Sequence, residues 1–228
     1  MSTATAVATH DSALEPPLKE HHHAHHFPSA RAEAEASKLG MWAFLVTEIL
    51  LFGGLFCAYA VYHTTHHEMF KGAHEFLSVK MGGLNTVVLI FSSLTMALAV
   101  RAAQTNKPAR TVQLLLVTLA CAVTFLVVKY FEYSAKFEHG LLPGHYFKPE
   151  HALPFKDGHI FFGIYFLMTG LHGLHVLIGM AAITWVLVRS ARREFSSKYY
   201  TPVELVGLYW HLVDLIWIYL FPLLYLVG

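Results

Sequence analysis

Five long apolar runs, each almost free of Asp, Glu, Lys and Arg, constrain this chain more than any other feature of its sequence. They lie at about residues 39–62, 81–100, 111–131, 159–188 and 205–227. A helix rises 1.5 Å per residue, so about 20 residues cross a hydrocarbon core of about 30 Å. Strands of transmembrane barrels are about 10 residues long and alternate in polarity, which these runs do not. The sequence therefore predicts an all-α, polytopic transmembrane bundle of five helices.

The charge content excludes several other classes of protein. Only 14% of the 228 residues are charged, whereas soluble domains carry about 25%. A nucleic-acid binder, an acidic scaffold and a disulfide-built secreted module all conflict with this composition. Cys57 and Cys121 fall inside apolar runs, where a thiol packs as a small hydrophobe and has no spacing partner for a metal or redox pair.

Residues 1–38 are polar and form a segment distinct from the apolar runs. They contain the tract EHHHAHH, which could bind metal loosely, and the stretch ARAEAEAS, which could be helical. No fixed geometry surrounds the histidines, so a solvated tail is the favoured interpretation. We expect a disordered, His-rich cytoplasmic tail over 1–38 and a five-helix transmembrane domain over 39–228.

The lysines and arginines predict the orientation of the spans, because these residues concentrate on the cytoplasmic side of membrane proteins. The side that holds the N-terminal tail carries ten of them: Lys19, Arg31, Lys38, Arg101, Lys107, Arg110, Arg189, Arg192, Arg193 and Lys198. The other side carries six: Lys71, Lys80, Lys129, Lys136, Lys148 and Lys156. We expect a cytoplasmic N-terminus and, with five spans, an external C-terminus.

Glu48 is the one charged residue of the first run and lies near its middle. An ionisable side chain at this depth costs about 2.5 to 3.5 kcal/mol on insertion scales, so it needs a partner or a purpose. Two hypotheses stay open. Glu48 is either a proton relay or a carboxyl that fastens two helices together through a hydrogen bond.

The fourth run contains TGLHGLHVLIG, in which His172 and His175 are three residues apart and therefore neighbours on a helix surface. These histidines could ligate a metal or a haem iron, with His211 of the fifth run as a third ligand. Hydrogen bonds between helices are the favoured interpretation. The same run carries small residues that would let a neighbouring backbone come close: Gly163, Gly170 and Gly173.

Two further pairs of polar residues stand at helical spacing. In YWHLVDLIWIY of the fifth run, His211 precedes Asp214 by three residues, and we expect the two to pair. In KYFEYSAKF at the end of the third run, Lys129 and Glu132 are also three apart and are expected to pair near the outer interface. None of these residues forms a nucleophile with an adjacent base or a phosphate-binding loop, so we expect no catalytic residue and no metal site.

Taken together, the motifs resemble cytochrome c oxidase subunit III, the accessory membrane subunit of haem-copper oxidases. The resemblance rests on one segment from each run, in the family's order: KLGMWAFLVTEILLFGGLFCAY, LNTVVLIFSSLTMALA, KYFEY, DGHIFFGIYFLMTGLHGLHVLIG and YWHLVDLIWIYLF. Family members with seven helices have two helices before the helix that carries the buried glutamate. Only a polar tail precedes it here, so the chain looks like the five-helix bacterial form that is also found in quinol oxidases.

The resemblance implies a place in a respiratory chain of the bacterial inner membrane. It implies that haem and copper reside in the partner subunits I and II and that this chain has no cofactor of its own. The implied role is to pack on subunit I, hold structural phospholipids, support proton uptake and protect the oxidase during turnover. The complex would reduce dioxygen to water with electrons from a cytochrome c or a quinol and translocate protons. Glu48, His172, His175, His211 and Asp214 match buried polar positions of the family.

Three alternatives remain open. The chain could be an accessory subunit of a quinol oxidase or of a nitric oxide reductase, which share the bundle and differ in their partners. The intramembrane histidines could instead bind haem and make the chain an electron-carrying membrane anchor. Finally, Glu48 could serve an autonomous proton channel.

Overall fold

The computed structural model describes residues 27–74, 76–142, 147 and 158–226. The tract EHHHAHH lies outside these residues. The described part folds into α1 (Ala30–Thr65), α2 (His67–His74), α3 (Val79–Gln104), α4 (Pro108–Glu138), α5 (Gly158–Ala191) and α6 (Thr201–Tyr225). All of these helices except α2 are long and apolar enough to cross a membrane. The predicted all-α bundle with five spans is confirmed.

Helix α1 begins well before the first apolar run. Ser29 caps it, since the Ser29 hydroxyl accepts a hydrogen bond from the backbone N–H of Ala32 at 3.2 Å, and Glu33 lies in the first turn, where a negative charge stabilises a helix. The Ala/Glu stretch is therefore helical. The 36 residues of α1 extend over roughly 54 Å at 1.5 Å per residue, so the helix is longer than a hydrocarbon core is thick.

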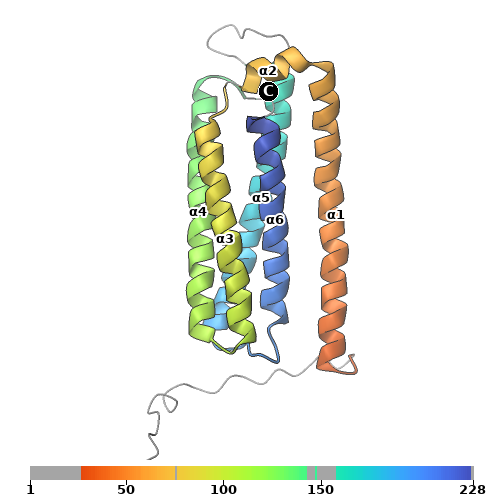
Figure 1. Cartoon of the computed structure of the whole chain (residues 1–228), viewed down its shortest axis with the longest axis vertical. Helices are drawn as coiled ribbons and strands as arrows, with labels where there is room; N and C mark the ends of the chain where they lie inside the picture. The colour runs from red at the N-terminus through yellow and green to blue at the C-terminus, as the bar shows by residue number, and fades with distance from the viewer. Residues whose placement is uncertain (1–26, 75, 143–146, 148–157, 227–228) are drawn as a thin grey trace, which may run out of the picture.

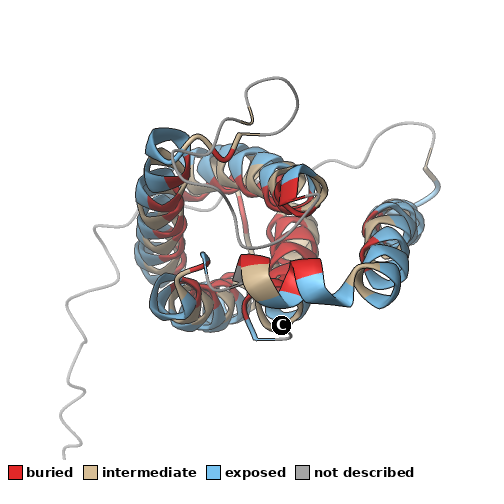
Figure 2. Cartoon of the chain, turned by 90° about the horizontal axis from the view of Figure 1, so that it is seen from above, coloured by how far each residue is buried: buried red, intermediate tan, exposed pale blue. Residues whose placement is uncertain are grey.

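Helices α3 to α6 form a bundle in which successive helices run in opposite directions, and α1 stands beside it (Figure 1). The short α2 crosses one end and connects α1 to α3; we call this the α2 end, and the opposite end, where α1 begins, the tail end. Viewed along the bundle, the buried faces of α3 to α6 turn inward, whereas most of α1 is exposed (Figure 2). Within this chain α1 packs mainly against α6 and less extensively against α2 and α5.

Large aromatic side chains fill the interior of the bundle. The largest fully buried ones include Trp210, Trp217, Tyr165, Tyr225 and Phe125. Apolar side chains also cover the outside of the helices, such as Leu39, Trp42, Leu50, Leu84 and Leu177. Lipid tails are as apolar as these side chains, so close packing and hydrogen bonds, rather than hydrophobicity, hold such helices together. The surface fits a multi-pass membrane protein.

The glycines that permit close helix contact are not the expected ones. Among the described residues, an added Cβ would meet nothing nearer than 4.0 Å at Gly163, Gly170 or Gly173. At Gly179, in contrast, the Cβ would lie 2.8 Å from the ring of Trp210, so α5 and α6 approach closely there. No other helix of the described chain comes close to the expected stripe, because helical spacing identifies residues that share a face but does not tell which face meets a neighbour within the chain.

Candidate functional site

Polar contacts tie α1 to α6 near both ends of the membrane-spanning region. Toward the tail end, Lys38 Nζ lies 2.9 Å from Glu204 Oε1, and the two side chains are 39% and 24% exposed. Toward the α2 end, the buried Tyr59 hydroxyl donates a hydrogen bond to the carbonyl oxygen of Leu223. Leu223 lies in the last turn of α6, and Tyr59 supplies a donor to its carbonyl oxygen from the neighbouring helix.

A third contact fastens α1 to α5 at mid-depth. Glu48 Oε2 lies 2.8 Å from His175 Nε2, and the two side chains are 14% and 9% exposed. The other ring nitrogen, Nδ1, lies 2.8 Å from the carbonyl oxygen of Leu171. Tyr209 of α6 donates a hydrogen bond to the carbonyl oxygen of His175 at 3.1 Å. The structure thus brings together two residues that the sequence presented on separate runs.

His172 has a different environment from His175, although the two are less than one turn apart. It is fully buried, and neither of its ring nitrogens has a hydrogen-bonding partner among the described residues. Its ring packs against those of Phe125 and Trp217, with centroid distances of 5.5 and 5.3 Å. The hydrogen bond to another helix that was expected for His172 is therefore not formed.

The expected pair of His211 and Asp214 is not formed either. His211 Nδ1 lies 2.7 Å from the hydroxyl oxygen of Ser93 on α3. Asp214 is 1% exposed, and neither of its carboxyl oxygens has a hydrogen-bonding partner within the described part of the chain. Ser93 and Ser92 lie near the Asp214 carboxyl, but the Ser93 hydroxyl contacts His211, and the Ser92 hydroxyl donates to a carbonyl of its own helix and accepts from Trp210 Nε1. The His211 ring turns toward α3, while Asp214 points into the interior.

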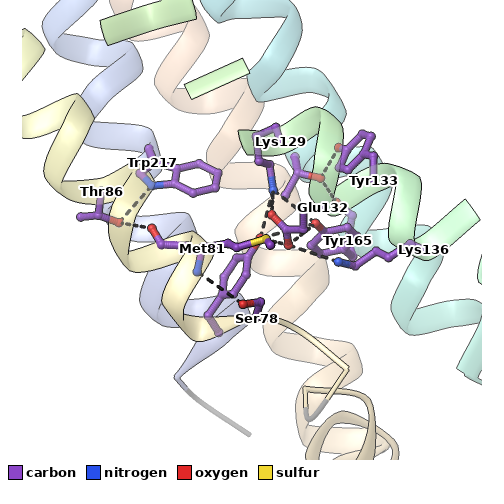
Figure 3. Close-up of polar contacts among 12 residues, drawn as sticks. Ser78, Met81, Thr86, Lys129, Glu132, Tyr133, Lys136, Tyr165 and Trp217 are labelled. Atoms are coloured by element: carbon purple, nitrogen blue, oxygen red, sulfur yellow. Dashed lines mark hydrogen bonds and ion pairs between the residues drawn. The ribbon is translucent and has the colours of Figure 1, made fainter. Parts of the chain in front are cut away.

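Glu132 is the centre of a buried polar cluster near the α2 end, which we call the Glu132 cluster: Lys129, Glu132, Lys136, Tyr165 and Tyr225. Oε2 of Glu132 accepts from Lys129 at 3.0 Å, and Oε1 accepts from Lys136 at 3.2 Å and from the hydroxyls of Tyr165 and Tyr225. Lys129 and Lys136 lie on either side of the carboxylate (Figure 3). The predicted ion pair of Lys129 and Glu132 is confirmed.

All three N–H donors of Lys129 find partners in this cluster. They point at Glu132, at the Tyr165 hydroxyl at 3.2 Å and at the Tyr225 hydroxyl at 3.0 Å. The ammonium also lies 5.0 Å from the centre of the Trp217 ring, within the range of a cation–π interaction. One buried carboxylate thus neutralises two buried ammonium groups only in part, and the tyrosines supply the remaining polar contacts.

Sequence reasoning named Glu132 and Lys129 but not the rest of the cluster. Lys136 follows Glu132 by four residues, so helical spacing could have identified it. Tyr165 and Tyr225 lie 33 and 93 residues further along the chain. No local pattern points to contacts at such separations.

The histidines considered as metal ligands do not converge. His172 faces aromatic rings, His175 faces Glu48 and His211 faces Ser93. Within the described ranges, no group of three or more His, Cys, Asp and Glu side chains is placed to hold a metal ion. The arrangement offers contacts between helices rather than a ligand set.

Comparisons with known proteins agree in the family they indicate. A family model described as cytochrome c oxidase subunit III matches residues 18–228. "Cytochrome c oxidase subunit 3" of Thermostichus vulcanus is 32% identical over 206 residues, which cover 90% of this chain and 91% of that protein. "Heme-copper oxidase subunit I+III" of Aeropyrum pernix is 30% identical over 193 residues, which cover 82% of this chain and 22% of that protein. "Probable quinol oxidase subunit 3" of Staphylococcus aureus is 27% identical over 199 residues, 86% of this chain and 91% of that protein.

Proposed function

Because the chain belongs to the cytochrome c oxidase subunit III family, we propose that it works as the accessory membrane subunit of a haem-copper oxidase that reduces dioxygen with electrons from cytochrome c. The haem and copper lie in partner subunits, and this chain contributes no catalytic residue. The family match over residues 18–228, on a chain with five membrane-spanning helices, carries this proposal.

The proposed direct partner is subunit I, with subunit II in the same complex. The name of the Aeropyrum pernix relative joins subunits I and III in one protein, and the matched region is 22% of it. A protein that contains both subunits keeps them in one membrane and in equal amounts. This supports a stable pairing of the corresponding separate chains.

The proposed role within the complex is to hold structural phospholipids, support proton uptake and prolong activity during turnover. Helix α1 presents large apolar side chains away from the bundle, including Trp42 and Leu50, which lipid tails or a partner helix can cover. Glu48 and His175 provide a polar pair at mid-depth on the side of the bundle that faces α1. These features suit a subunit that acts through packing and proton exchange.

We place the chain in the bacterial inner membrane, with a cytoplasmic tail end and an external α2 end. The connections from α3 to α4 and from α5 to α6 both lie at the tail end (Figure 1). They carry Arg101, Lys107 and Arg110 in one case and the basic group from Arg189 to Lys198 in the other. The excess of Lys and Arg at this end supports the orientation.

Purification of the tagged full chain in a mild detergent tests the assignment. We expect subunits I and II to co-purify, together with haem and copper in fixed ratio. In a Glu48→Ala variant we expect lower assembly or a shorter lifetime during turnover, with a smaller effect on the initial rate of oxygen reduction. Co-purification of nitric oxide reductase subunits without copper would reject the assignment. A variant complex that assembles normally, retains its lipids and lasts as long as the parent would reject the role of Glu48.

A quinol oxidase is the second candidate, because the Staphylococcus aureus relative carries that name and matches 86% of this chain. The two candidates differ in the electron donor and not in the bundle described here. Oxygen consumption by the purified complex with reduced cytochrome c, compared with consumption with a quinol, separates them. Activity with the quinol alone would favour the second candidate.

A further inference from the structure

The imidazole of His175 makes two short polar contacts that together need two protons. Nδ1 lies 2.8 Å from the carbonyl oxygen of Leu171, which can only accept, so Nδ1 must carry a proton. Nε2 lies 2.8 Å from Oε2 of Glu48. A bare ring nitrogen facing a carboxylate oxygen would bring two acceptors together, so this second contact needs a proton as well. A neutral imidazole has only one.

We infer that Glu48 and His175 form a binding site for one proton, held between Glu48 Oε2 and His175 Nε2. The proton belongs either to a protonated Glu48 that donates to Nε2 or to an imidazolium that donates to the Glu48 carboxylate. In both forms the pair is electrically neutral as a whole, which suits a site surrounded by apolar groups. The inference deepens the proposed role in proton uptake and rests on it for its purpose, although the count of donors and acceptors is independent of it.

Release of this proton to a base outside the site changes the contacts of the pair. The pair becomes an anion with a single ring proton, which can serve only one of the two contacts. If the proton stays on Nδ1, the contact between α1 and α5 loses its donor. If it moves to Nε2, the bare Nδ1 faces the carbonyl oxygen of Leu171. The proton-loaded pair is therefore the one that satisfies both contacts seen in the structure.

The surroundings of the pair contain few other titratable groups. Tyr209 of α6 is adjacent, with its hydroxyl on the carbonyl oxygen of His175, and His172 of α5 is the neighbouring histidine. The ring of Phe52 on α1 packs edge-on against the imidazole, with centroids 5.1 Å apart. Among the described residues, neither Glu48 nor His175 forms an ion pair with any other side chain. The shared proton is thus what neutralises the Glu48 carboxylate.

Nitrogen-15 NMR of the full chain in lipid bilayers, labelled at histidine, tests the inference directly. The signals of His175 are assigned by their loss in a His175→Gln variant. At neutral pH we expect a protonated Nδ1, with Nε2 either accepting a hydrogen bond or protonated as well. A His175 that carries its only proton on Nε2, with Nδ1 bare, would overturn the inference. On raising the pH, release of the shared proton is marked either by a move of the ring proton from Nδ1 to Nε2 or by loss of the hydrogen bond at Nε2 while Nδ1–H is retained.

A Glu48→Gln variant supplies a donor that cannot be removed by a change in pH. The amide N–H can donate to Nε2, so we expect the neutral His175 ring to carry its proton on Nδ1. Protonation on Nε2 in this variant would show that Leu171 does not determine the tautomer and would refute the argument. His172→Gln is the matched control and should leave the His175 signals unchanged. The NMR measurement needs no oxidase activity. A result that contradicts the shared proton can therefore be told apart from a result that contradicts the proposed oxidase role.

Discussion

The bundle of α3 to α6 and the seam between α1 and that bundle are held together in different ways. In the bundle, the single carboxylate of Glu132 receives hydrogen bonds from four side chains on three helices. At the seam, each polar contact joins a single pair of groups, and the pairs are spread along α1. The most apolar 18-residue window of α6 is 56% buried and that of α1 is 17% buried. We therefore expect the bundle to unfold as one unit and α1 to detach first.

The largest difference between the two regions should come from Glu132→Gln. The change leaves the ammonium groups of Lys129 and Lys136 buried without a negative charge. Breaking a buried ion pair by removing one partner costs about 3 to 5 kcal/mol. We expect a loss of this size in the free energy of unfolding, measured by circular dichroism of the chain in mixtures of mild detergent and SDS.

Glu138→Gln is the matched control, because Glu138 lies on the same helix and is exposed. It should leave the unfolding midpoint nearly unchanged. Equal effects of the two substitutions would show that the bundle does not depend on the Glu132 cluster.

The packing of the bundle can be tested separately with Gly179→Ala. The added Cβ would lie 2.8 Å from the ring of Trp210, which is fully buried and has little room to move. Overpacking of this kind costs about 1 to 3 kcal/mol. Gly173→Ala, on the same helix but in open space, should be neutral in the same unfolding assay. A loss of unfolding free energy in Gly173→Ala as large as that in Gly179→Ala would contradict the close contact between α5 and α6.

At the seam, Tyr59→Phe should have a smaller effect. It removes the hydroxyl that donates to the carbonyl oxygen of Leu223 and leaves the ring in place. One neutral hydrogen bond contributes about 0.5 to 1.5 kcal/mol. We expect faster proteolysis or hydrogen exchange of α1 with little change in α3 to α6. The exposed Tyr62 provides a control through Tyr62→Phe, and increased exchange throughout the bundle would argue against a separate seam.

Sequence reasoning identified the spans because each is a local property of 20 or more neighbouring residues. It also identified the pair of Lys129 and Glu132, since the two lie three residues apart on one helix. It could name Glu48 and His175 individually but not as partners, because 127 residues separate them.

The wrong predictions of polar partners have the same cause, namely contacts between segments that are distant in the sequence. His211 and Asp214 were expected to pair from their spacing, but His211 turns to Ser93 on another helix. The choice of partner depends on how helices rotate about their own axes in the bundle. That rotation follows from packing between distant segments, such as the contact of Gly179 with Trp210, which a single sequence does not display.

The smallest effect should come from Lys38→Met, which removes the contact of α1 with Glu204 at the tail end. The pair is 2.9 Å apart, but its side chains are 39% and 24% exposed. Exposed ion pairs contribute about 0 to 1 kcal/mol and are screened by salt. We expect a slight increase in hydrogen exchange at the start of α1 in low salt that disappears at about 1 M salt, where the Debye length is about 3 Å. A Glu204→Gln variant should show the same change, and the double variant should add nothing to either. Additive losses of protection against exchange that persist in high salt would mean that Lys38 and Glu204 stabilise α1 independently and not as an ion pair.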